Sequence, residues 1–215
     1  MTQAHDWLKA LAALQPTTTW QEWLAALTGL LCAWLTVKNK LSNWPWGIVS
    51  VLAYSWVFWQ AKLYASFGLN LLYFFPCCVY GWWYWARGGP AQNDDLPVRK
   101  LSAKQNAIWV ALTLAATFGI GYPIARFTND PIPYADSLAT GMSIIAQWMQ
   151  AKKWYENWWY WIGLDIVYIA YVYPTQHLYV SMALYMVYLA VAIRGAVEWR
   201  HLLHGERYRS YTENA

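Results

Sequence analysis

The chain has 215 residues, of which 59% are hydrophobic and only 12% are charged, and its formal net charge is +4. An ordinary soluble domain has roughly 25% charged residues, so this composition argues against a water-exposed surface. The small positive charge does not indicate nucleic-acid binding, and we expect none. The uncharged stretches 41–61 and 107–125 are instead long enough to cross a bilayer core, which takes about 20 apolar residues.

In chain order, the sequence divides into an N-terminal segment and seven apolar spans. Residues 1–19 lack the basic region and cleavage site of a signal peptide, so we expect them in the mature protein, with 5–14 as a possible interfacial helix. Hydropathy predicts transmembrane helices near 20–37, 44–62, 68–86, 104–125, 135–151, 158–174 and 178–199. The predicted parts are a three-helix bundle (20–86), a cytoplasmic loop (87–103), a linking helix (104–125), a second three-helix bundle (134–200) and a cytoplasmic tail (201–215).

The distribution of basic residues predicts how the spans are oriented, because cytoplasmic loops carry an excess of lysine and arginine. If the N-terminus is outside, Lys9, Lys62 and Arg126 lie on the outer side. The other twelve of the fifteen basic residues then lie on the inner side. We therefore expect the N-terminus outside and the C-terminus in the cytoplasm.

The two predicted bundles resemble each other in sequence. Residues 63–73 align with 178–188 at an offset of 115, which also places Trp46 on Trp161, whereas an offset of 114 places Asn43 on Asn157. The extra fourth span makes both three-helix units run in the same direction. The predicted fold is therefore an all-α integral membrane protein with 3+1+3 parallel repeats, as in SWEETs, where substrate binds near the midplane between the repeats.

Asp165 is the most informative residue for function. A carboxylate near the bilayer centre costs several kcal/mol unless it faces protein or water, so it should face the interior. Trp161, Asp165 and Tyr168 lie at i, i+4 and i+7 and share one helical face. Trp46, Ser50 and Tyr54 form the equivalent face of the second span, with Ser50 as the repeat mate of Asp165. We expect the two faces to line a binding cavity, although Asp165 as a link between helices is the alternative.

Further polar side chains at membrane depth complete the predicted substrate-binding site. They are Gln147 on the fifth span, Asn70 and Tyr73 on the third, and Tyr188, the repeat mate of Tyr73. Amides in a membrane can also simply join helices. The many tryptophans can likewise be interfacial anchors, and this is the alternative for Trp46 and Trp161.

The sequence offers little support for an enzyme. Cys32, Cys77 and Cys78 all fall in apolar spans, where a thiol behaves as a small hydrophobe, so we expect neither a disulfide nor a metal site. There is no glycine-rich nucleotide loop, nucleophile elbow or pair of catalytic carboxylates in the sequence. We expect no catalytic activity and no cofactor.

Four features together resemble the Pnu family of bacterial vitamin transporters, most closely its nicotinamide riboside transporters. They are NWPWG at 43–47, NWWYWIG at 157–163, LYASFGLNLLY at 63–73 and the polar loop before a lone fourth span. The resemblance covers roughly residues 20–200. It implies a SWEET-like fold, a location in the bacterial inner membrane, a homotrimer, and uptake of a vitamin down its gradient with trapping by cytoplasmic phosphorylation.

The chemistry of nicotinamide riboside fits the predicted site. Its pyridinium ring is cationic and suits a tryptophan face, a contact worth up to about 2 kcal/mol when desolvated. Asp165 could balance the charge, Gln147 or Asn70 could bind the carboxamide, and the tyrosines could bind the ribose. The alternatives are a transporter of thiamine or riboflavin, a SWEET-like sugar carrier, or a membrane scaffold without a ligand. The buried carboxylate weighs against the sugar.

Overall fold

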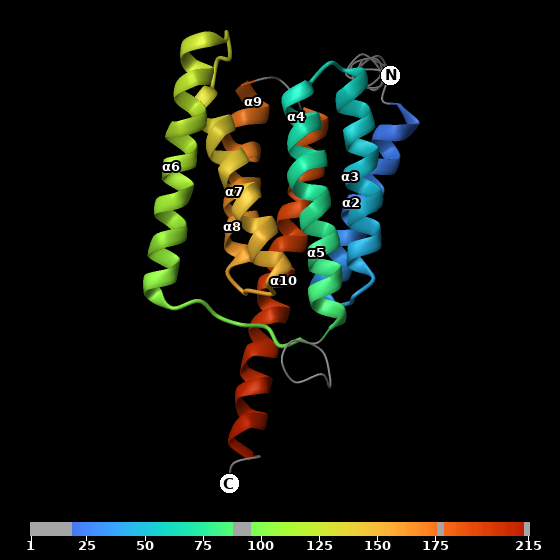
Figure 1. The fold of residues 1–215 in the computed structure, drawn as a ribbon, viewed down its shortest axis with the longest axis vertical. Helices are drawn as coiled ribbons and strands as arrows, with labels where there is room; N and C mark the ends of the chain where they lie inside the picture. Colours follow the sequence, from blue (N-terminus) through green and yellow to red (C-terminus); the bar gives the residue numbers. More distant parts are fainter. Residues whose placement is uncertain (1–18, 88–95, 176–178, 213–215) are drawn as a thin grey trace, which may run out of the picture.

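The computed structural model describes residues 19–87, 96–175 and 179–212, and these residues form seven helical rods and no strands (Figure 1). The rods are α2 (Trp20–Val37); α3 (Asn43–Gln60); α4 (Tyr64–Leu69) continuing through the π-helical turn η1 (Asn70–Phe74) into α5 (Phe75–Ala86); α6 (Ala103–Phe127); α7 (Pro133–Ala151); α8 (Asn157–Val167) continuing through the π-helical turn η3 (Tyr168–Val172) into α9 (Tyr173–Thr175); and α10 (Tyr179–Thr212).

The expectation of seven helices is confirmed. The third rod begins at Tyr64 instead of 68, and the last one continues to Thr212, well beyond the expected end at 199. The possible interfacial helix at 5–14 lies outside the described residues.

Local sequence signals set several of the helix ends. At the start of α2, the Thr19 N–H donates to Glu22 Oε2 at 2.8 Å and the Glu22 N–H donates to Thr19 Oγ1 at 3.4 Å. This reciprocal pair is a capping box, and Ser102 begins α6 in the same way. The short turns after α2 and α7 pass through Asn39 and Lys153, whose φ angles are 55° and 59°.

Six of the seven rods form a closed ring. Following the contacts around the ring, α2 packs on α3, α3 on α5, α5 on α7, α7 on α8, α8 on α10, and α10 returns to α2. α6 packs against α7 and stands at the edge of the molecule (Figure 1). The interior of the ring is therefore the place where side chains from all six rods can meet.

One end of the ring is closed by four tryptophans. Trp44 meets Trp85 edge to face at 5.3 Å between ring centroids, Trp158 meets Trp199 at 5.4 Å in the same way, and Trp85 lies 5.9 Å from Trp199. The Trp85 Nε1–H donates to Ala151 O at 3.2 Å, and the Trp199 Nε1–H donates to Thr36 O at 3.0 Å. These two bonds join α5 to α7 and α10 to α2, so the cluster holds the ring together at this end.

The segment before α6 is docked against the turn between α7 and α8. The Arg99 N–H donates to Lys153 O at 3.0 Å, and Arg99 O accepts from the Tyr155 N–H at 2.8 Å. The Leu101 N–H donates to both carboxylate oxygens of Glu156 at 3.1 Å. Burial raises the pKa of Glu156, and the Leu101 N–H partly opposes that shift. The linking segment is thus fixed to the second group of helices.

The outer surface of the rods is strongly apolar. Large exposed side chains include Trp20, Trp23, Leu27, Leu72 and Phe118. Within the described part of the chain, Ala103–Phe127 and Ser181–Gly205 are each long and apolar enough to cross a membrane, with mean hydropathies of 1.6 and 1.3. A surface of this kind suits lipid better than water.

Candidate binding cavity

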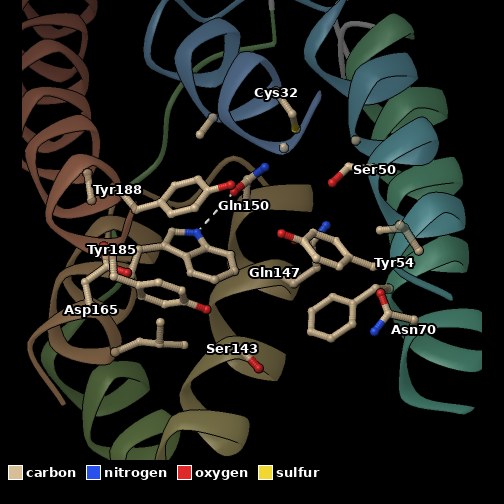
Figure 2. Close-up of a pocket in the computed structure, with 18 of the residues that line it drawn as sticks. Cys32, Ser50, Tyr54, Asn70, Ser143, Gln147, Gln150, Asp165, Tyr185 and Tyr188 are labelled. Atoms are coloured by element: carbon tan, nitrogen blue, oxygen red, sulfur yellow. Dashed lines mark hydrogen bonds between the residues drawn. The ribbon is translucent and has the colours of Figure 1, made fainter. Parts of the chain in front are cut away.

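A cavity of about 640 Å³ lies inside the ring of helices. Its size falls within the roughly 300–1,000 Å³ of typical small-molecule sites. All six rods of the ring contribute to its wall, which extends from Trp44 and Trp158, next to the tryptophan cluster, to Ser66, Tyr173 and Ser181 near the other ends of the rods. Figure 2 shows polar and aromatic side chains converging on this space from opposite sides.

The helical face predicted on α8 and η3 does line the cavity. Trp161, Asp165 and Tyr168 all belong to the wall, as their i, i+4, i+7 spacing predicts. Asp165 is only 3% exposed. In the described part of the chain, no hydrogen bond or ion pair joins its carboxylate to another group. A buried carboxylate of this kind needs a compensating partner, and the cavity is where a ligand could supply one.

Tyrosines surround the carboxylate. Tyr168 lies 5.0 Å from Tyr173 in a stacked pair and 4.8 Å from Tyr185, between ring centroids. Tyr185 in turn lies 5.7 Å from Tyr188. Tyr54 of α3 belongs to the same wall and faces these rings from the other side of the cavity (Figure 2). The wall therefore offers several ring faces and hydroxyl groups close to one buried carboxyl group.

Two glutamines lie one turn apart on α7. The Gln147 Nε2–H donates to Cys78 Sγ at 3.6 Å, a weak bond. Gln150 accepts a hydrogen bond from the Trp161 indole, with 3.1 Å between Nε1 and Oε1. Both amides are buried and line the cavity. α7 thus supplies the amide groups of the wall.

Ser50 and Asn70 also lie in the wall, on the side formed by α3 and η1. The Ser50 hydroxyl donates to Ala25 O at 2.8 Å, and the Asn70 Nδ2–H donates to Ser66 O at 3.1 Å. The Oδ1 of Asn70 keeps its acceptor capacity for a ligand. Of the nine predicted site residues, the structure therefore brings seven to one cavity: Ser50, Asn70, Gln147, Trp161, Asp165, Tyr168 and Tyr188.

The other two predicted residues do not line the cavity. Trp46 is 40% exposed and is absent from the wall, where its neighbours Trp44 and Gly47 take part. Tyr73 turns its hydroxyl to Ile144 O, to which it donates at 2.7 Å, and so joins η1 to α7. Successive side chains along a helix point in directions about 100° apart. The predictions for Trp46 and Tyr73 were both wrong by one residue, which is enough to turn a side chain away from the cavity.

A similar tryptophan–glycine contact occurs in each half of the chain. Trp44 packs on Gly81, and Trp158 packs on Gly195 in the same way. The two contacts are 114 residues apart, whereas the offset used to match Trp46 with Trp161 was 115. An offset of 114 matches Trp161 with Gly47 and Asp165 with Val51, and both Gly47 and Val51 line the cavity.

Several wall residues were not predicted as binding residues, and some of them had a signal in the sequence. Ser181, Leu184, Tyr185 and Tyr188 follow helical spacing along α10, so Tyr185 could have been found from Tyr188. Tyr173 lies five residues after Tyr168, a spacing that an α-helix does not place on one face. For Gln150, no pattern in the sequence predicted a place in the cavity wall.

This set of groups can bind and orient a polar aromatic molecule. Indole and phenol faces attract a cationic ring, the carboxylate balances its charge, and amides and hydroxyls bind its polar substituents. Within the described residues, no group of three or more His, Cys, Asp and Glu side chains could hold a metal ion.

Comparison with known proteins identifies relatives over nearly the whole chain. Residues 19–201 match the family described as Nicotinamide mononucleotide transporter. The chain is 25% identical to the nicotinamide riboside transporter PnuC of Escherichia coli strain K12, over 84% of this chain and 85% of that protein. It is 28% identical to PnuC of Neisseria mucosa, over 86% and 73%. The crystal structure of the vitamin B3 transporter PnuC superimposes with a TM-score of 0.69 at 25% identity, over 91% of this chain and 86% of that one.

Proposed function

Because the chain belongs to the nicotinamide mononucleotide transporter family, we propose that it takes up nicotinamide riboside across a bacterial inner membrane. The ligand binds in the cavity inside the ring, between the two three-helix units. It crosses by facilitated diffusion and is trapped by phosphorylation in the cytoplasm. The names of the relatives support the substrate.

The observation that carries the proposal is the buried Asp165 carboxylate on the cavity wall. A sugar could only donate hydroxyl hydrogen bonds to this carboxylate, whereas a pyridinium ring also gains a counter-charge. Trp161 lies one turn from Asp165 on the same face and offers an aromatic surface beside that charge. The amides of α7 lie close enough to the same space to bind a carboxamide group.

The proposal includes a parallel repeat of two three-helix units, α2 to α5 and α7 to α10, linked by α6. In Figure 1, α2 and α7 run in the same direction, and so do α3 and α8, and α5 and α10. Matching features lie 114 residues apart at Asn39 and Lys153, which both have positive φ, and at Trp85 and Trp199 in the tryptophan cluster. These pairs support a twofold axis along the membrane normal, the plan of SWEETs.

The two π-helical turns explain why the offset between matching residues of the two units changes from 114 to 115 and back to 114. α3 and α8 begin 114 residues apart, α4 and α10 begin 115 apart, and Gly81 and Gly195 are again 114 apart. A π-turn inserts one residue into a helix. η3 adds one residue in the second unit, and η1 then adds one in the first, which restores the original offset.

The proposed orientation predicts which loops can be labelled from outside the cell. We expect a membrane-impermeant thiol reagent to modify a cysteine introduced at Asn129 in intact cells and to miss one introduced at Asp94. The reason is the excess of basic residues on the side of Asp94. Both variants should label after the cells are opened, and labelling of Asp94→Cys alone in intact cells would reverse the orientation.

The function itself is tested by ligand binding to purified protein. We expect calorimetry to detect binding of nicotinamide riboside, with much weaker binding of nicotinamide, which lacks the charge and the ribose. Thiamine, also a cationic aromatic molecule, is the second candidate, and riboflavin and a hexose complete the series. Tighter binding of thiamine, or of the hexose, would reject the proposed substrate.

Transport mode and assembly need separate measurements. In liposomes, facilitated diffusion should equilibrate labelled nicotinamide riboside without an ion gradient, so accumulation above the external concentration would contradict it. The homotrimer is proposed from family resemblance, and the mass of the protein in detergent tests it.

A further inference from the structure

One hydrogen bond ties the Trp161 ring in the cavity wall to Gln150 of the neighbouring helix. The bond joins α8 to the last turn of α7, with 3.1 Å between Trp161 Nε1 and Gln150 Oε1, and it is the dashed line in Figure 2. We propose that Gln150 is a positioning residue, which holds the Trp161 ring in the orientation that the ligand needs. This inference rests on the proposed function, since it concerns the same cavity.

The need for a positioning residue follows from the freedom of the ring. The χ2 torsion of tryptophan has a broad profile, so a ring that lines an open cavity can turn about it. The indole nitrogen is the only polar atom of the side chain, and it donates only. One bond to that atom, on one edge of the ring, removes most of the rotation. Pre-organisation of this kind lowers the entropy that a ligand loses on binding.

Gln150 is itself well held. It is 7% exposed and lies in the last turn of α7, before the short turn that leads into α8. That turn is fixed by the segment before α6, through the bonds of Arg99 to Lys153 and Tyr155. The amide that orients Trp161 therefore belongs to a rigid part of the molecule.

The bond also determines which way the Gln150 amide faces. Because the indole can only donate, the oxygen of Gln150 must point to Trp161, and its NH₂ group points the other way. In Figure 2 the nitrogen of Gln150 lies on the side toward Cys32, also a residue of the cavity wall. Among the described residues, no hydrogen bond involves this nitrogen. It is a free donor for a ligand oxygen.

A double-mutant cycle on ligand affinity separates positioning from this direct contact. Gln150→Leu should weaken nicotinamide riboside binding by roughly five- to tenfold, since the variant loses both the hydrogen bond to Trp161 and the fixed position of the ring face. Trp161→Phe keeps a ring but removes the indole N–H. In the Trp161→Phe background, Gln150→Leu should reduce the ligand affinity by a clearly smaller factor, since only the free amide donor of Gln150 remains to be lost.

The control for a general loss of packing is Thr117→Val on α6. It removes a buried hydrogen bond, Thr117 Oγ1 to Thr113 O at 2.8 Å, away from the cavity, and should leave the affinity unchanged. The positioning role is wrong if the double variant loses affinity by the product of the two single fold-losses, or if Gln150→Leu leaves the affinity unchanged. The proposed transporter function would stand in either case.

A second measurement tests the inference without any ligand. In nitrogen-15 spectra of the unliganded protein, the Trp161 indole N–H signal, assigned by its loss in Trp161→Phe, should exchange faster with water in Gln150→Leu. Unchanged exchange would overturn the inference. If the wild-type protein binds no nicotinamide riboside, the proposed function fails, and this exchange experiment still decides whether Gln150 holds the ring.

Discussion

Replacing Asp165 by asparagine is expected to weaken nicotinamide riboside binding by about ten- to hundredfold, and to change the affinity for an analogue with a reduced, uncharged ring much less. A carboxylate 4–6 Å from a pyridinium attracts it by roughly 3–4 kcal/mol at an effective dielectric constant near 20. Desolvation removes part of this, and about 1.4–2.8 kcal/mol should survive. Calorimetric titration of both ligands against both proteins measures the difference.

The comparison of two ligands distinguishes a counter-charge from a structural role. If Asp165 only joined helices, the substitution would weaken the binding of both ligands to the same extent, because the protein would be misassembled. Asp136→Asn is a matched control, because Asp136 lies on α7 in the first turn and does not belong to the cavity wall. Equal affinity of wild type and folded Asp165→Asn for the cation would rule out the counter-charge.

Gly81→Ala and Gly195→Ala are expected to destabilise the protein strongly and to similar extents. In each case the added methyl group would overlap the six-membered ring of a tryptophan, Trp44 at Gly81 and Trp158 at Gly195. These rings are almost fully buried and belong to the cluster that closes one end of the ring of helices, so they have no room to move. Overpacking typically costs about 1–3 kcal/mol, and it should be at the upper end here.

Thermal unfolding in detergent, followed by a thiol-reactive dye or by loss of monodispersity, measures this effect. Gly119→Ala on α6 is the control, because a methyl group there meets nothing within 4 Å. It should leave the unfolding temperature unchanged or raise it, since alanine favours a helix. Full stability of either cluster variant would mean that the tryptophan packing is not rigid.

Much of the architecture could be predicted from the sequence, for a simple physical reason. A helix in a bilayer must satisfy its own backbone and be apolar over about 20 residues, so composition alone indicates where it lies. The same reasoning identified Asp165 as interior-facing, because a carboxylate cannot face lipid. Helical spacing then placed Trp161 and Tyr168 with it, and the three do share the cavity wall.

Tertiary structure decided the details that spacing cannot supply. Tyr168 and Tyr173 are about 140° apart in a regular α-helix, yet they stack because the π-helical turn η3 adds a residue between them. The face that α3 turns to the cavity was decided by Trp44 packing on Gly81, which sends Trp46 outward.

Gln150 shows most clearly what helical spacing cannot predict. Its part in the site depends on a hydrogen bond to Trp161, eleven residues away on the next helix. The sequence determined the helices, their number and the presence of a buried carboxyl group, because each follows from the cost of placing polar groups in lipid. Which rings face one another, and which amide orients them, depends on packing between helices, and only the folded chain determines that.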